Sequence, residues 1–118
     1  MGDYSILGFE DRWCVERKMI SDLVGFVGRE REKTVKKLVR MREIITRGGW
    51  CGLAIEAKEG ELYVPRQTDA IHPEVMRAFL LSVNVRYGIH TYIHHDREWV
   101  ARWVLDRAVK FYNILRET

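Results

Sequence analysis

Near its N-terminus the chain reads Arg12-Trp13-Cys14-Val15-Glu16-Arg17-Lys18, and this run predicts a β-strand. Side chains two residues apart on a strand point to the same face of the sheet. Glu16 and Lys18 should therefore lie together. The opposite face takes Trp13, Val15 and Arg17. A carboxylate beside an ammonium on a rigid strand can bind a metal ion and orient a water molecule. The run therefore predicts a strand that carries a metal-binding site.

Two further carboxylates stand at set distances from this strand. Asp3 follows Gly2 and is separated from Glu16 by twelve residues, whereas Asp22 follows Lys18 after three. If Asp3 approaches from a neighbouring strand, the site gains its second oxygen ligand. Two carboxylates are enough for Mg²⁺, because this ion keeps several waters and takes further oxygens from a phosphate.

The spacing of these residues resembles the signature of the XPF-type nuclease family, a branch of the PD-(D/E)XK nucleases. Its members carry Gly-Asp, a variable spacer, Glu-Arg-Lys, three residues and Asp, and every fixed position is matched here. Likeness to small bacterial and archaeal members continues at residues 2–6, 15–18 and 22–25, and more weakly at 53–56. The resemblance implies a single restriction-endonuclease-like α/β domain over residues 1–118, with a mixed central sheet flanked by helices.

The resemblance also implies a role for the residues of the signature. Asp3 and Glu16 would be the side-chain ligands of Mg²⁺ or Mn²⁺, with the main-chain carbonyl of Arg17 as a third ligand. Lys18 would orient the attacking water and offset charge on the transition state. The Arg17 guanidinium points away from Glu16 and is expected to steady the strand or Asp22.

The activity that the resemblance implies is that of a metal-dependent DNA endonuclease. Such a phosphodiester hydrolase would cut flaps, forks or other branched DNA during repair or recombination. Family members often pair through this domain, so a homodimer is expected. The alternative is a catalytically silent DNA-binding or dimerisation module of a larger repair complex. The intact Glu16-Arg17-Lys18 motif favours the enzyme.

The chain departs from the family's pattern ahead of Gly2. Members normally have a strand before the Gly-Asp turn, whereas only Met1 precedes the turn in this sequence. The domain is therefore expected to be N-terminally short. Asp3 would then lie near a frayed chain end, and the sheet would have an exposed edge.

Positive charge is concentrated between residues 29 and 47. This stretch holds eight Lys and Arg against three Glu, whereas the whole chain has a net charge of +3. At 100° per residue, one side of a helix here is apolar. That side is formed by Val35, Leu38, Val39 and Ile45. Basic side chains gather opposite, at Lys33, Lys36, Lys37 and Arg40. These four either contact DNA phosphates without reading sequence or simply face water.

Composition limits the class of protein further. A chain of 118 residues builds one domain. Its longest apolar runs are far too short to span a bilayer, and its polar opening is unlike a secretory signal. Cys14 and Cys51 fall in predicted strands and should be reduced core residues. The expected setting is cytoplasmic, in a prokaryotic or viral context or associated with a nucleoid.

Other polar side chains offer weaker sites. His90 and His94 share a strand face, but four residues along a strand separate them by roughly 13 Å, too far for one zinc ion. Glu56 ends a predicted central strand near the site. Glu56 would either bind an auxiliary metal ion or support the ligands of the site.

The predicted elements follow the order β-β-α-α-β-α-β-α. Strands at 4–9 and 13–18 form a hairpin, and a short helix begins at the N-cap Ser21. The later elements are helices at 29–47, 73–87 and 96–116, strands at 50–57 and 91–94, and a short strand within a polar loop at 62–64.

Overall fold

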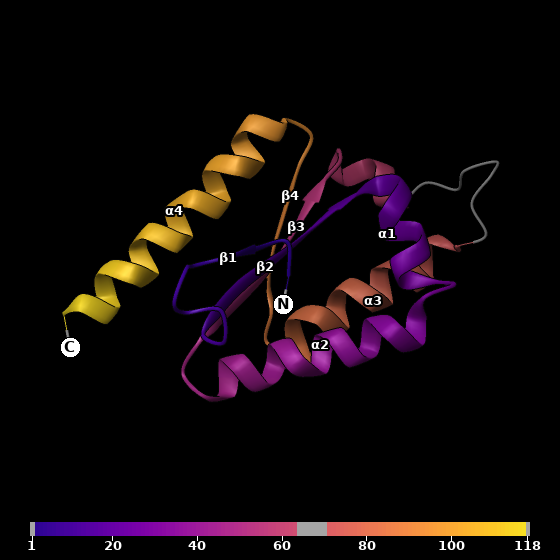
Figure 1. The fold of residues 1–118 in the computed structure, drawn as a ribbon. Coiled ribbons are helices and arrows are strands. Elements are labelled where there is room, and N and C mark those ends of the chain that lie inside the picture. The colour runs from indigo at the N-terminus through magenta and orange to yellow at the C-terminus, as the bar shows by residue number, and fades with distance from the viewer. Residues whose placement is uncertain (1, 64–70, 118) are drawn as a thin grey trace.

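The computed structural model describes residues 2–63 and 71–117, which form a mixed sheet flanked by helices (Figure 1). The strand order across the sheet is β1-β2-β3-β4, with bounds Tyr4–Ser5, Trp13–Met19, Trp50–Glu56 and His90–His94. β1 runs antiparallel to β2, whereas β2, β3 and β4 are parallel. The α/β class, the mixed sheet and the order of the main elements are therefore confirmed.

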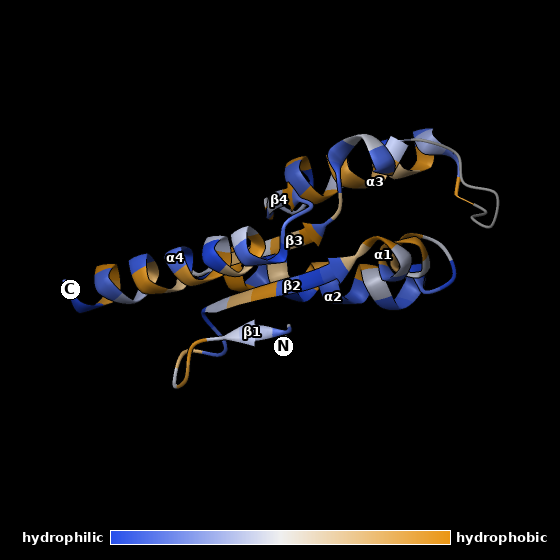
Figure 2. Ribbon diagram, turned by 90° about the horizontal axis from the view of Figure 1, so that it is seen from above, coloured by the Kyte–Doolittle hydropathy of each residue, from blue (hydrophilic) through white to orange (hydrophobic). Residues whose placement is uncertain are grey.

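Helices cover both faces of the sheet. The bounds of α1 to α4 are Ile20–Val27, Arg31–Thr46, Pro73–Val85 and Arg97–Arg116. The first three helices pack on one face and α4 packs on the other. Parallel neighbours need a crossover, and these are supplied by α1 with α2 and by α3. Figure 2 shows apolar and polar residues alternating along α4, as expected of a helix with one face on a sheet.

None of the helices in the described part of the chain is long and apolar enough to cross a membrane.

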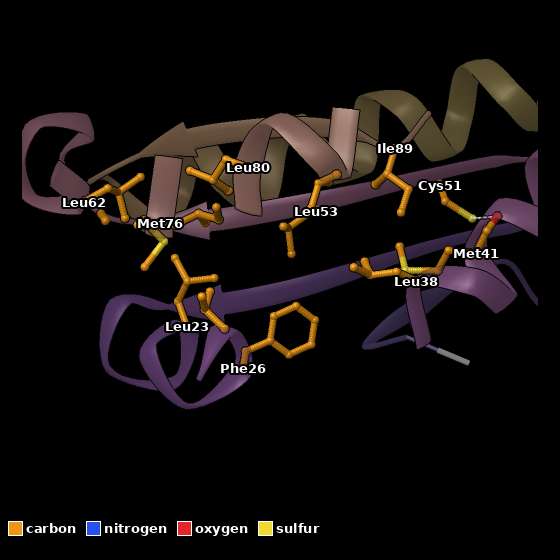
Figure 3. Packing of buried hydrophobic residues seen from close by; sticks show 14 of the residues in the cluster. Leu23, Phe26, Leu38, Met41, Cys51, Leu53, Leu62, Met76, Leu80 and Ile89 are labelled. Atoms are coloured by element: carbon orange, nitrogen blue, oxygen red, sulfur yellow. Dashed lines mark hydrogen bonds between the residues drawn. The ribbon is translucent and has the colours of Figure 1, made fainter. Parts of the chain in front are cut away.

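The larger core lies between the sheet and the layer of α1, α2 and α3 (Figure 3). Leu23 and Phe26 of α1 and Leu38 of α2 meet Leu53 of β3 and Leu80 of α3 in this core. The sheet face opposite carries a smaller, aromatic core against α4. The strand that holds the candidate site is therefore packed on both sides.

Both cysteines are buried in the core as free thiols. Cys14 and Cys51 are register partners on β2 and β3, and their sulfur atoms lie 3.3 Å apart. This hydrogen bond, together with burial, raises the pKa of the Cys51 thiol, which favours its protonated form. The prediction of buried, unbridged cysteines is confirmed.

The predicted first strand is too long. β1 ends at Ser5 because the connection to β2 bonds to itself. The Phe9 amide donates to the Ile6 carbonyl and the Arg12 amide donates to the Phe9 carbonyl. Gly8, with φ of +86°, supplies the left-handed backbone of this turn.

Two other local predictions are wrong. Ser21 is not the N-cap of α1, because β2 continues directly into the helix and Met19 takes the capping position without a side-chain bond. Residues 62 and 63 belong to a 3-10 helix, η1 (Glu59–Tyr63), rather than to a strand, and residue 64 lies outside the described residues.

The buried side of α2 is rotated from the predicted one. Val35 and Val39 are 40% and 41% exposed. The buried residues are instead Thr34, Leu38, Met41 and Ile44. The Thr34 hydroxyl donates to the Phe26 carbonyl at 2.6 Å, which satisfies this polar group in the core. An apolar count along the helix overlooks such a residue.

Candidate functional site

Glu16 lies in the middle of β2 and is almost completely buried. Strand alternation sends its side chain to the same face as Cys14, the face covered by α1 and α2. Only 2% of the residue is exposed. One carboxylate oxygen, Oε1, accepts a hydrogen bond from Lys37 Nζ at 3.0 Å and lies 3.5 Å from Lys18 Nζ. Two cations therefore neutralise one side of this carboxylate.

The other carboxylate oxygen of Glu16, Oε2, is buried and has no hydrogen-bond partner among the described residues. Leaving such an oxygen without a partner is costly, so folded proteins nearly always supply one. A hard divalent cation is a partner that carboxylate oxygens bind well. The unsatisfied oxygen is therefore a candidate ligand atom for a cation.

Lys18 lies on the Glu16 side of β2, as strand alternation predicts. Its ammonium also sits 4.7 Å from the centre of the Phe26 ring, where the ring face attracts a cation. The Lys18 side chain is 20% exposed. It is thus held by an apolar and a charged neighbour while it still reaches solvent.

Asp3 is tied to β2 by two hydrogen bonds, although it stands near the start of the chain. Its amide donates to the Val15 carbonyl at 3.0 Å, and its Oδ2 accepts from the Arg17 amide at 2.8 Å. That amide belongs to the peptide bond after Glu16, so the Asp3 carboxylate lies beside the backbone of the buried residue. Asp3 remains exposed. These bonds hold it more firmly than the expected fraying suggests.

Gly2 permits this close approach. Its φ of +133° lies in a region that L side chains rarely adopt. A Cβ atom at this position would also lie 3.0 Å from the Val15 carbonyl oxygen. Because any larger residue would push the chain away from β2, the glycine before Asp3 has a structural reason.

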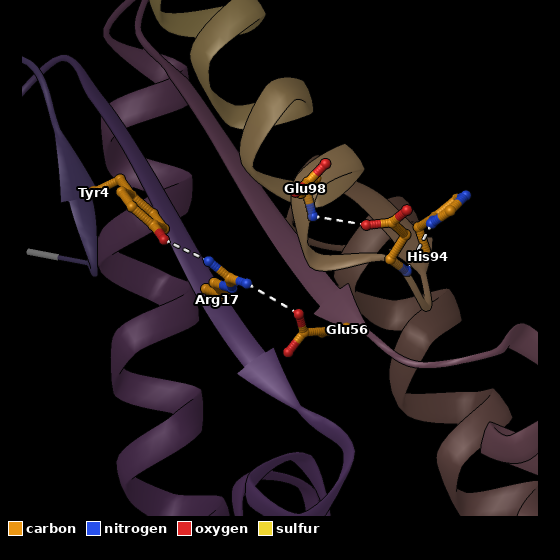
Figure 4. Close-up of polar contacts among 6 residues, drawn as sticks. Tyr4, Arg17, Glu56, His94 and Glu98 are labelled. Carbon is orange, nitrogen blue, oxygen red and sulfur yellow. Dashed lines mark hydrogen bonds and ion pairs between the residues drawn. The ribbon is translucent and has the colours of Figure 1, made fainter.

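Arg17 lies on the opposite face, as predicted, and joins three strands (Figure 4). Its Nη1 donates to the Tyr4 hydroxyl at 2.8 Å and its Nη2 pairs with Glu56 Oε1 at 3.1 Å. The hydrogen bond to Tyr4, with a smaller contribution from Glu56, raises the pKa of Arg17. The guanidinium therefore steadies the strand, and its described contacts do not include Asp22, which is exposed in the first turn of α1.

We expect Arg17→Met to weaken this link between strands. A hydrogen bond to a charged group contributes about 1.5–3 kcal/mol. Arg17 makes two, but solvent screening of its partly exposed side chain reduces their sum, so the free energy of unfolding should fall by about 2 kcal/mol. Urea unfolding measures the change. The matched control is Arg12→Met, because Arg12 is exposed just before β2. An equal loss in both variants would contradict the bracing role.

Glu56 does not share a face with Glu16. In the parallel register it lies beside Met19, which places its side chain on the Arg17 side of the sheet. Its contact with Arg17 supports the site through the strand rather than as a ligand. Within the described residues, no group of three or more His, Cys, Asp and Glu side chains could hold a metal ion.

The histidines make other contacts. His90 stacks on Trp50 with ring centres 5.1 Å apart. His94 Nδ1 accepts a hydrogen bond from the Asp96 amide at 2.9 Å, and its ring stacks on Tyr92. Asp96 in turn caps α4. His90 therefore joins β4 to β3, whereas His94 and Asp96 join β4 to the helix that follows it.

The basic residues of α2 do not form one uniform face. Lys33, Lys36 and Arg40 are exposed, as a phosphate-binding or solvated surface requires. Lys37 instead turns toward Glu16. The position of Lys37 in the sequence indicates why it differs from the other three. It stands three residues after Thr34 and four before Met41, at the border of the buried side of the helix.

Comparisons with known proteins add nothing to the resemblance carried by the signature residues. No protein-family model matches the chain, and the search of curated proteins gives no significant match.

The residues present nevertheless fit a Mg²⁺ or Mn²⁺ ion. Glu16 Oε2 is an unsatisfied carboxylate oxygen, and the Asp3 carboxylate is accessible beside the same stretch of β2. Both supply oxygen, the ligand atom that these ions prefer, and Mg²⁺ commonly needs only one or two carboxylates.

Proposed function

We propose that this protein is a Mg²⁺- or Mn²⁺-dependent DNA endonuclease whose site is built on Glu16. The observation that carries the proposal is the buried Glu16 carboxylate, with Oε2 unsatisfied and Lys18 beside it. Asp3 adds a second carboxylate from a neighbouring segment. A plain salt bridge on the surface would explain neither the burial nor the unsatisfied oxygen.

The chain's own residues divide the work of phosphodiester hydrolysis. Asp3 and Glu16 would hold the ion, which when bound polarises the phosphate and lowers the pKa of a coordinated water. Lys18 offsets the negative charge that develops on the phosphate oxygens. Arg17 keeps β1 and β2 in register, and Lys33, Lys36 and Arg40 offer cations for neighbouring phosphates.

The substrate and the assembly follow from the resemblance. Branched or junction-containing DNA is the proposed substrate, in repair or recombination, and a homodimer is the proposed assembly. Exposed apolar residues of α4 would suit a partner chain. They include Trp99, Leu105, Val109 and Ile114.

A second candidate function is a silent DNA-binding module. The contact between Lys37 and Glu16 favours it, because an internal cation already neutralises the carboxylate without a metal. On this alternative the cluster serves only to stabilise the fold. The basic surface of α2 would still bind DNA.

Cleavage of labelled flap, fork and linear DNA with Mg²⁺, Mn²⁺ or EDTA tests the proposal. Lys18→Ala should cut about 100-fold more slowly, because a pre-positioned charge at the transition state is lost. Asp3→Asn should require more metal for the same rate. Lys110→Ala is the control, since Lys110 is an exposed lysine on α4. DNA binding without cleavage would favour the silent module, and cleavage that survives both changes would exclude the proposed site.

A further inference from the structure

Lys37 contacts the central carboxylate of the site but stands outside the Gly-Asp and Glu-Arg-Lys signature. It comes from α2, twenty-one residues further along the chain than Glu16, and its Nζ lies 3.0 Å from Glu16 Oε1. The contact is shorter than that of Lys18, the signature lysine, which lies 3.5 Å from the same oxygen. The closest ion pair of Glu16 is therefore with a residue that the signature does not include.

The two oxygens of Glu16 differ in their surroundings. Oε1 faces both ammonium groups, whereas Oε2 is buried without a partner among the described residues. A divalent cation on this carboxylate would lie within a few ångströms of Lys37, because the two oxygens belong to one small group. Like charges at such a separation repel strongly in a partly buried site.

The side chain of Lys37 is able to move away from Glu16. It is 30% exposed, against 3% for the Glu16 side chain, and it lies at the border of the solvent side of α2. Its flexible four-carbon stem can place the ammonium in solvent, and a divalent cation on Glu16 would offset the lost ion pair. Its neighbours on that side are Lys33, Lys36 and Arg40, which are exposed.

We propose that Lys37 is a positioning residue that stands in for the metal. It pairs with the buried Glu16 carboxylate while no divalent cation is bound, and this ion pair breaks when the cation binds. The proposal rests on the proposed function, because it takes Glu16 as the metal ligand. The consequence is a protein that folds without metal but binds the metal less tightly than its carboxylates alone would.

Displaced Lys37 would also add a cation to the exposed basic side of α2. Metal binding and DNA binding would then support each other, because each favours the conformation in which Lys37 has left Glu16. Linkage requires this coupling to be reciprocal. A metal-dependent gain in DNA affinity is thus a second consequence of the same contact.

Calorimetric titration with Mn²⁺ alone tests the proposal without measuring cleavage. Lys37→Met should bind Mn²⁺ about tenfold more tightly than the wild type, because the competing charge is gone. Lys58→Met, which removes an exposed lysine after β3, should change the affinity less than twofold. Lys37→Gln, which keeps a donor for Glu16 but no charge, should behave like Lys37→Met and covers the case in which the methionine variant folds poorly.

Each outcome has a separate meaning. If the wild type binds Mn²⁺ in a way that Glu16→Gln abolishes, but neither Lys37 variant binds it more tightly, the stand-in role is wrong and the metal site survives. Weaker binding by both Lys37 variants would likewise overturn it. If neither the wild type nor any Lys37 variant binds Mn²⁺, the metal site and the stand-in role fail together. Tighter binding without any DNA cleavage would support Lys37 and reject the nuclease.

Discussion

Glu16→Gln is expected to lower metal-dependent DNA cleavage by about 1000-fold. The change removes the charge of the only buried carboxylate among the described residues. A loss of about 4 kcal/mol in charge stabilisation at the metal corresponds to this factor. The fold should survive, because glutamine has nearly the same shape and its carbonyl oxygen can still accept the bond from Lys37. Single-turnover cleavage of a labelled fork with Mn²⁺ measures the effect.

The control for this change is Glu32→Gln, which alters an exposed carboxylate in the first turn of α2. It should leave the rate within twofold. Circular dichroism must show that both variants are folded. A Glu16→Gln protein that is folded and keeps more than a tenth of the wild-type rate would remove Glu16 from the mechanism.

Gly49→Ala is expected to produce a large loss of stability. Gly49 lies where α2 turns into β3, and a Cβ atom there would collide with the Arg12 carbonyl oxygen and lie 2.6 Å from Ile44 Cγ2. The same Arg12 carbonyl accepts the Trp50 amide, so neither chain can easily move aside. Overpacking of this kind costs about 3 kcal/mol, which should lower the melting temperature by roughly 10 °C.

Gly60→Ala provides the comparison for Gly49→Ala. Nothing lies within 4 Å of a Cβ atom at Gly60. Thermal unfolding should therefore show a change of less than about 0.5 kcal/mol, as is usual for exposed positions. Similar melting temperatures for the two variants would mean that the turn before β3 adjusts freely.

The fold could be predicted from the sequence because its elements are marked by local signals. Alternation identified β2 through Glu16 and Lys18, and the helix predicted from residue 73 does begin there, at Pro73. The helix predicted at 96–116 also has its start confirmed, because Asp96 caps α4 and accepts a bond from the Glu98 amide. Such signals depend on only a few neighbouring residues, and the folded structure agrees with them.

Contacts between separate elements were harder to predict. Lys37 resembles its neighbours on α2, and its contact with Glu16 depends on which side of the helix is buried, the side that holds Thr34 and Met41. The Tyr4–Arg17–Glu56 contacts likewise depend on strand register, which no short stretch of sequence encodes. The ligand pair Asp3 and Glu16 stays a prediction that the metal titrations will test.

The direct passage from β2 into α1 gives the three-residue gap in the signature a geometric meaning. No loop separates Lys18 from Asp22, because Met19 ends the strand and Ile20 begins the helix. The gap therefore sets an angle as well as a length. One residue more or fewer would turn the Asp22 carboxylate by about 100° around the helix axis. A flexible loop could accommodate such an insertion without moving Asp22. Because β2 passes directly into α1, the insertion would instead change the direction in which the Asp22 side chain points.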